Sequence, residues 1–156
     1  EFYLHSVAAL KQGGYYSYSS TVIDRIPILN NINVSDVKII SENVQILFSL
    51  NEILRKTINT FLSRIQSNFT TEKPSNKLKE FYNYDFKTFV TELKKKKITL
   101  SLKQQDEWEQ YFNEYKTEIN KLQQQINQTD DEIDQLVYKL YGLTPEEIKI
   151  VEESVN

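Results

Sequence analysis

The sequence predicts a mainly α protein: a long antiparallel helical hairpin or bundle, preceded by a small N-terminal extended or β segment. The 156 residues contain only three Gly and three Pro, which are too few turn residues for an all-β sandwich or barrel. Two segments, at about 42–69 and 104–127, repeat apolar residues at steps of three, four, four, three and four. This heptad spacing is typical of helices that pack along one another.

Residues 1–40 differ from the rest of the chain. We expect a short helix, or the end of one, over residues 2–10, a break at the two glycines 13 and 14, and then a β-prone stretch. Tyrosine and serine hydroxyls can bond phosphate oxygens, so this stretch is a candidate DNA contact, and a β-turn with a half-buried strand is the alternative. The candidate residues here are Tyr15, Tyr16, Ser17, Tyr18, Ser19 and, further along, Arg25.

Residues 41–156 form the predicted helical scaffold. Ser41 is the expected N-cap of the first long helix, and Pro74 stops the chain from continuing it. Asp85 is the expected cap of a helix over 86–96. Leu54 and Ile119 belong to the two heptad stripes, so both are expected to be buried where the long helices pack.

The end of the chain carries strong helix start and stop signals. Thr129 with Glu132 matches a capping box, which predicts a separate helix over 130–141. Gly142 is then the expected C′ residue. Thr144-Pro145-Glu146-Glu147 supplies an N-cap, a proline at N1 and a glutamate at N3, which predicts a last helix over 145–153.

Charge is unevenly distributed along the chain. Residues 70–100 hold eight lysines and four acids, whereas residues 101–156 hold five lysines and thirteen acids. A uniformly basic nucleic-acid module is therefore excluded, and only the middle zone could face phosphate. Its most basic run is a candidate DNA contact, with a solvated helix end as the alternative: Lys94, Lys95, Lys96 and Lys97.

No set of residues predicts catalysis or metal binding. The acids Asp130, Asp131, Glu132 and Asp134 are better explained by the start of the helix predicted there, because carboxylates favour the positive end of the helix dipole. The single histidine, His5, has no evident catalytic partner. Trp108 lies in a heptad stripe, so core packing is favoured over base stacking.

Composition excludes further classes. Without cysteine there is no disulfide framework, zinc knuckle or thiol nucleophile. No apolar run approaches the ~20 residues that span a bilayer, and no secretory signal opens the chain, so a cytoplasmic location without membrane contact is expected. The absence of methionine suggests an internal or C-terminal piece of a longer protein.

Two stretches resemble a known family. The segment GGYY at 13–16, followed by IDRIPI at 23–28, resembles the end of a TaqI-like target-recognition domain. The segment IDQLVYKLYGLTPEEI at 133–148 resembles the ending of the same proteins, which are adenine-specific DNA methyltransferases. Such proteins are often fused to a nuclease as type IIG restriction–modification enzymes, and helical spacers of similar length separate the two stretches there.

The resemblance implies that residues 1–40 are the tail of the recognition domain and that double-stranded DNA and the rest of the parent enzyme are the partners. The parent would bind S-adenosylmethionine and Mg²⁺. This chain lacks the (N/D)PP(Y/F) motif, because its three prolines are all isolated, so it would position DNA without methylating it. The alternative is a coiled-coil-like interaction module unrelated to DNA, which associates with itself or a partner through the helical stripe.

Overall fold

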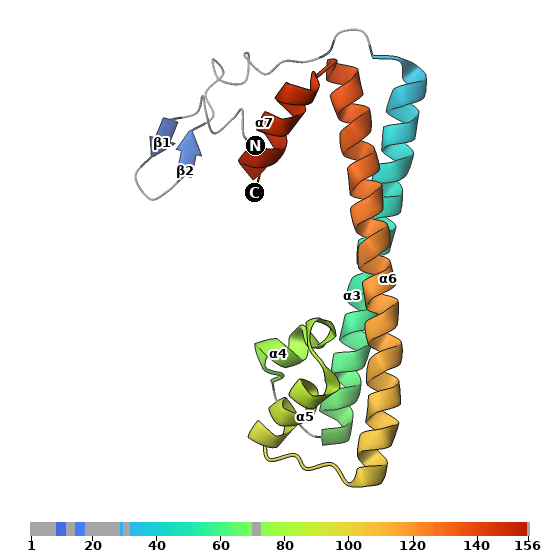
Figure 1. The fold of residues 1–156 in the computed structure, drawn as a ribbon, viewed down its shortest axis with the longest axis vertical. Helices are drawn as coiled ribbons and strands as arrows, with labels where there is room; N and C mark the ends of the chain where they lie inside the picture. The colour runs from blue at the N-terminus through green and yellow to red at the C-terminus, as the bar shows by residue number, and fades with distance from the viewer. Residues whose placement is uncertain (1–8, 12–14, 18–28, 30–31, 70–72, 156) are drawn as a thin grey trace. The chain divides into compact units, whose positions relative to one another are not determined.

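The computed structural model describes residues 9–11, 15–17, 29, 32–69 and 73–155. It confirms a mainly α fold (Figure 1). In chain order the elements are β1 Ala9–Lys11, β2 Tyr15–Ser17, α3 Val34–Phe69, α4 Asn76–Lys79, the 3-10 turn η1 Phe81–Asn83, α5 Phe86–Lys95, α6 Leu102–Tyr141 and α7 Pro145–Val155. Two compact units divide this chain: Glu42–Glu132 forms one, and Glu1–Ser41 with Ile133–Asn156 forms the other.

The N-terminal segment contains a short antiparallel pair of strands. β1 pairs with β2 in a register that sets Leu10 opposite Tyr16. The prediction of a helix over residues 2–10 is wrong for Ala9 and Leu10, because these residues pair with β2 as part of a strand instead of forming helical hydrogen bonds. The β-prone reading of Tyr15–Ser17 is confirmed.

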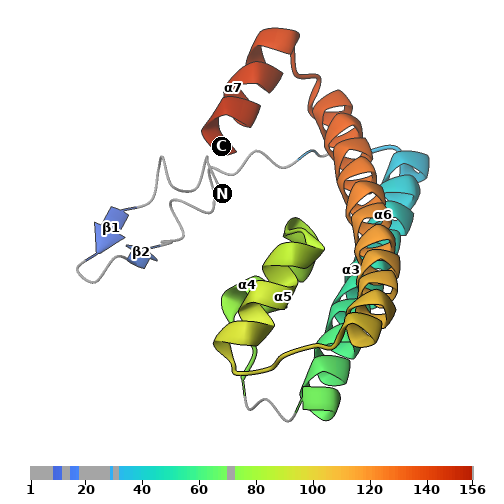
Figure 2. The same cartoon turned by 60° about the horizontal axis from the view of Figure 1, so that its bottom comes forward.

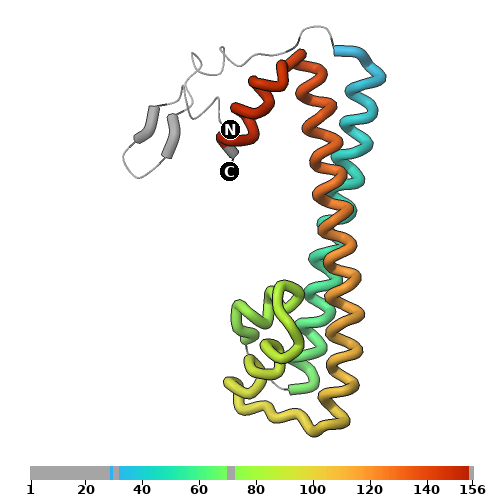
Figure 3. The backbone as a smooth tube through the Cα atoms, viewed as in Figure 1, coloured from blue at the N-terminus to red at the C-terminus, as the bar shows by residue number. Residues whose placement is uncertain are grey.

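Within the unit Glu42–Glu132, α3 and α6 lie side by side, as the two views in Figure 1 and Figure 2 agree. They are antiparallel: Phe61 of α3 stacks on Tyr111 of α6 at 5.5 Å between ring centroids, while Phe69, further along α3, meets the earlier Trp108 at 5.1 Å. The tube in Figure 3 shows α4 and α5 beside one end of this pair. The predicted helical hairpin is therefore confirmed.

The core of this unit lies where α4 and α5 cover the helix pair. Its buried side chains come from every helix of the unit: Phe61, Ile65, Leu78, Phe81, Phe89, Leu93, Leu100, Phe112 and Ile119. Ile119 is fully buried, as predicted, whereas Leu54 is only half-buried. Leu54 lies seven residues before Phe61 in α3, and it packs at the edge of this core rather than inside it.

The first long helix begins eight residues earlier than predicted. Asn33 caps α3, since its side-chain Oδ1 accepts a hydrogen bond of 3.1 Å from the backbone N–H of Ser35. Ser41 is an interior residue, and its hydroxyl donates to the carbonyl oxygen of Val37 at 2.8 Å. The predicted cap at Ser41 is therefore wrong, because a serine can also bond the preceding helical turn.

The second long helix does not break at Thr129. α6 runs without interruption through Tyr141, and the Thr129 hydroxyl donates to the carbonyl oxygen of Gln125 at 2.9 Å. Glu132 accepts a hydrogen bond from the Gln128 side chain at 3.1 Å instead of closing a capping box. The separate helix over 130–141 is therefore a wrong prediction, and so is the helix-start explanation for Asp130 and its acidic neighbours.

The last helix is capped as predicted. Gly142 has φ +62°, and the N–H of Leu143 donates to the carbonyl oxygen of Tyr138, which is the hydrogen bond of a Schellman motif. Thr144 and Glu147 form the capping box through reciprocal hydrogen bonds of 2.8 and 3.3 Å, with Pro145 as the first residue of α7. Hydrogen bonds from Thr144 hold the pKa of Glu147 below its ordinary value.

The left-handed backbone at Gly142 gives a testable prediction. Gly142→Ala should destabilise this end of the chain by about 1–2 kcal/mol, because L residues with a Cβ are strained in that conformation. Nothing lies within 4 Å of the added Cβ, so the cost comes from the backbone alone. Gly142→Asn is the matched control and should cost less in thermal unfolding followed by circular dichroism, since asparagine tolerates positive φ. Equal costs for the two variants would contradict this reading.

Candidate nucleic-acid interface at a lysine-rich helix end

The lysine run lies at the C-terminal end of α5. Lys94 and Lys95 belong to the last turn, and Lys96 is the C-cap. The N–H groups of Lys97 and Ile98 donate to the carbonyl oxygens of Lys94 and Leu93, which is again a Schellman motif. Lys97 therefore occupies the C′ position, and it does so with φ 63°.

Lys95 is held by a buried glutamate. Its Nζ donates to Glu92 Oε1 at 2.7 Å, and the Ser75 hydroxyl donates to Glu92 Oε2, also at 2.7 Å. Ser75 also caps α4, by accepting a hydrogen bond from the N–H of Leu78. The hydrogen bonds from Lys95 and Ser75 lower the pKa of Glu92 against the opposing effect of burial. Lys95 is thus part of a contact that ties α5 to α4.

The other three lysines of the run differ in their surroundings. Lys94 lines a groove of about 580 Å³ between α5 and the start of α6, where Asp106 and Glu109 also lie. Lys97 is exposed and Lys96 half-buried. In the part of the chain that the structure describes, neither of these two forms an ion pair. Lys96 and Lys97 are therefore the strongest candidates for phosphate contact.

Other acids of α6 point away from α5. Lys116 donates to the Tyr84 carbonyl oxygen and Phe112 packs on Phe86, which defines the side of α6 that faces α5. Three exposed glutamates lie two or nine residues from Lys116, which is roughly 160–180° around the helix. They are Glu107, Glu114 and Glu118. These three carboxylates thus lie on the side of α6 away from α5, whereas Asp106 and Glu109 lie beside Lys94.

The N-terminal candidates are described only in part. Tyr15, Tyr16 and Ser17 form β2, and only their backbone is described. Tyr18, Ser19, Arg25 and also His5 lie outside the described residues. Their proposed contact with DNA stays a prediction from the sequence.

The acidic run in α6 forms no metal site in the residues that the structure describes. Asp130, Asp131, Glu132 and Asp134 are exposed along an uninterrupted helix. No group of three or more histidine or carboxylate side chains in the described ranges is placed to hold a metal ion. Asp85 is an N-cap, as predicted, since its Oδ1 accepts from the N–H of Thr88 at 2.8 Å.

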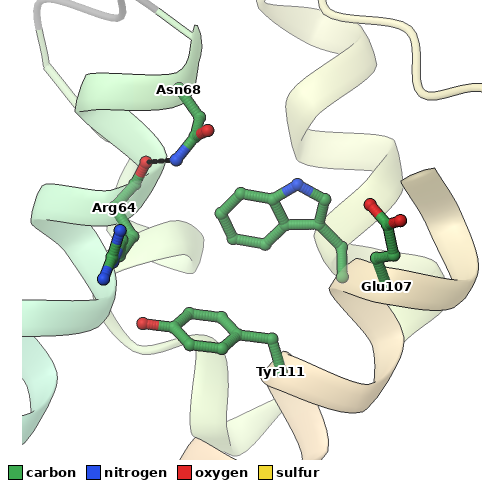
Figure 4. A pocket seen from close by; sticks show the side chains of 5 residues that line it. Arg64, Asn68, Glu107 and Tyr111 are labelled. Carbon is green, nitrogen blue, oxygen red and sulfur yellow. Dashed lines mark hydrogen bonds between the residues drawn. The ribbon is translucent and has the colours of Figure 1, made fainter.

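A pocket between α3 and α6 was not expected from the sequence. Figure 4 shows Arg64 and Asn68 on one side and Glu107 and Tyr111 on the other, around a space of about 240 Å³ that Trp108 also lines. The Trp108 ring contacts Phe69, Phe89 and Phe61, so the prediction of core packing for this residue is confirmed.

The sequence indicates only some of the residues that line this pocket. Trp108 and Tyr111 follow the heptad spacing, but Arg64 and Asn68 are polar residues that no motif distinguishes. One turn further along α6, a hydrogen bond with Tyr111 and the burial of the ring raise the pKa of Tyr115 to about 12. The Tyr115 hydroxyl therefore remains protonated near neutral pH and acts as a hydrogen-bonding, not a charged, group.

None of the helices that the structure describes offers the long apolar stretch needed to cross a membrane. No curated protein and no solved structure matches the chain. The model of one family, described as a domain of unknown function, DUF8810, matches residues 33–137, which include both long helices up to residue 137 and the helices between them. The chain belongs to the DUF8810 family.

Proposed function

We propose that this chain is the helical scaffold of an adenine-specific DNA methyltransferase or type IIG restriction–modification enzyme, and that it acts in the cytoplasm by positioning double-stranded DNA. The resemblance of residues 13–28 and 133–148 supports the family. The second stretch forms the end of α6, the Gly142 turn and the start of α7. The chain's isolated prolines do not fit a methyltransferase motif, so S-adenosylmethionine would belong to the rest of the parent enzyme.

The observation that carries the proposal is the backbone of Lys97. Among the described residues, α5 and α6 both end in a Schellman motif, and the C′ residue is lysine after α5 and glycine after α6. Glycine adopts positive φ at little cost, whereas a side chain there costs about 1 kcal/mol. A lysine held in that conformation next to Lys96 is consistent with a role for its charge, since strained residues concentrate at binding sites.

The charge distribution supports a weak, sequence-independent contact. Lys96 and Lys97 can meet phosphates, and Glu114 and its neighbouring glutamates lie on the side of α6 away from α5. Lys94 adds a third contact if the neighbouring acids of its groove are far enough from the duplex. Three phosphate contacts would give a log–log salt dependence with a slope of about −3. Specific base reading would come from the recognition domain of the parent enzyme.

The test is a fluorescence-anisotropy titration of duplex DNA at low salt. Replacing both lysines, with Lys96→Gln and Lys97→Gln, should weaken binding uniformly across DNA sequences and reduce the salt slope by about 2. Lys121→Gln with Lys139→Gln removes the same charge from exposed positions of α6 and should change the slope little. Absence of binding at ~0.1 mM protein, the weak end of non-specific affinity, would reject the DNA contact and favour the interaction module.

The variant Lys97→Gly distinguishes the effect of the Lys97 charge on DNA binding from the effect of its backbone conformation on stability. The free energy of unfolding of this variant should rise by about 0.5–1 kcal/mol, because glycine relieves the strain of the left-handed backbone. The variant should therefore unfold at a higher denaturant concentration. It should also bind DNA more weakly than the wild type. A variant that is more stable but binds equally well would show that the Lys97 charge has no part in the contact.

A further inference from the structure

One exposed face of α3 carries a regular row of five residues. They are Glu42, Ile46, Ser49, Ile53 and Lys56, at steps of four, three, four and three. This spacing places them on a single side of the helix. All five are exposed, and Ile46 and Ile53 keep 49% and 46% of their surface accessible. We call this row the α3 stripe.

The order of residue types along the α3 stripe is the same in both directions if the charges at its ends are exchanged. Both charges lie seven residues from Ser49, and Ile46 and Ile53 lie three and four residues from it. An acid and a base stand at the two ends, an isoleucine follows each of them, and the small Ser49 lies in the centre. An antiparallel copy would therefore set each charge opposite its complement. It would also set each isoleucine opposite the other isoleucine.

We propose that two copies of the chain associate through the α3 stripe, antiparallel about a two-fold axis at Ser49. Glu42 of each copy then pairs with Lys56 of the second copy. Ile46 of each copy packs on Ile53 of the second copy, which buries apolar surface that one chain leaves open. A contact that uses the same patch of both subunits is the form that two-fold dimers require.

The centre and the ends of the α3 stripe suit this contact. The Ser49 hydroxyl donates to the carbonyl oxygen of Gln45 in its own helix at 2.9 Å, so it needs no partner across the axis and leaves room for close approach. Lys56 reaches Glu52 at 2.7 Å, but both side chains are more than half exposed. Such a surface pair is weak, so Lys56 can exchange it at little cost.

The dimer should be weak. The α3 stripe runs from Glu42 to Lys56, which is about 21 Å of one helix, so the interface is smaller than the ~1,600 Å² typical of stable complexes. Analytical ultracentrifugation from about 10 µM to about 0.5 mM therefore covers the expected range of dissociation constants. We expect a reversible monomer–dimer equilibrium within it.

Charge exchange tests the antiparallel pairing. Glu42→Lys alone and Lys56→Glu alone should each weaken self-association roughly tenfold, because each sets like charges together at both ends of the interface. An equimolar mixture of these two variants should associate again, since the complementary pairs return between unlike chains. The double variant Glu42→Lys/Lys56→Glu should also recover, and circular dichroism checks that each variant stays helical.

Cross-linking tests the position of the axis. The sequence has no cysteine, so Ser49→Cys introduces a single thiol, which should form a disulfide-linked dimer quickly under mild oxidation. Phe48→Cys is the matched control, because Phe48 is 72% exposed but lies on another side of α3. A monomer throughout the concentration range, no recovery in the mixture, or equal cross-linking of the two cysteine variants would each overturn the proposal.

Discussion

Phe61→Ala should lower the free energy of unfolding by about 3–5 kcal/mol, the range for truncating a fully buried aromatic side chain. The Phe61 ring is completely inaccessible to solvent. It stacks on Phe81 at 3.8 Å between centroids, and it also contacts Phe89 of α5 and Phe112 of α6. Its removal would leave a cavity bordered by four separate elements, which cannot all move inward to fill it.

Phe48→Ala is the matched control for this prediction. It makes the same chemical change in the same helix, but Phe48 is 72% exposed. Surface substitutions of this kind usually change stability by less than ~0.5 kcal/mol. Urea unfolding followed by helical circular dichroism measures both variants. A similar loss in the two would mean that the ring cluster around Phe61 does not hold the unit together.

The heptad spacing predicted the helix pair correctly because it depends only on the period of the α-helix. It did not distinguish Ile119, which is buried, from Leu54, which is half-buried. Both belong to stripes with the same apolar spacing. The difference arises because α4 and α5 cover only one end of the helix pair. This is a feature of tertiary packing, which the spacing of apolar residues within one helix does not predict.

The capping signals succeeded or failed according to their surroundings. Thr144 lies two residues after Gly142 and directly before Pro145, so a helix must stop and restart there. Thr129 has the same capping pattern with Glu132, but the apolar period continues through it from Ile126 to Ile133. A threonine can bond the preceding turn as easily as it can cap, so the continuing period decides.

The sequence predicted the positive charge of the candidate site but not the geometry of its lysines. A run of four lysines identifies a basic helix end, but not which lysine is already engaged. Lys95 is engaged because Glu92 is buried, and the second partner of that carboxylate, Ser75, lies seventeen residues earlier. The positive φ of Lys97 also had no signal, since lysine rarely adopts it.

Glu92→Gln should destabilise the fold by about 1–3 kcal/mol at neutral pH, because hydrogen bonds to a buried charged group contribute about that much. The carboxylate side chain is 8% accessible and accepts from both Lys95 and Ser75. The amide has nearly the same shape, so the variant removes the charge without opening a cavity. The contact between α4 and α5 should weaken first.

The effect of this substitution should depend on pH. The folded-state pKa of Glu92 lies below its ordinary value of 4.5, so the carboxylate contributes stability above that value and loses it as pH falls through the folded pKa. The difference between wild type and Glu92→Gln should therefore be largest near pH 6–7. It should shrink steadily as the pH falls below about 4.5.

Glu52→Gln controls for the ion pair itself. Glu52 Oε1 also lies 2.7 Å from a lysine Nζ, that of Lys56 in α3, but the Glu52 side chain is 56% accessible. Water screens this pair, so its loss should change the unfolding midpoint little. If Glu52→Gln were as damaging as Glu92→Gln, or if the Glu92→Gln deficit persisted unchanged below the folded pKa, ionised Glu92 would not be the link between α4 and α5. The expected contrast arises because the two pairs share their distance and differ in burial, and burial decides how strongly a carboxylate holds its partners.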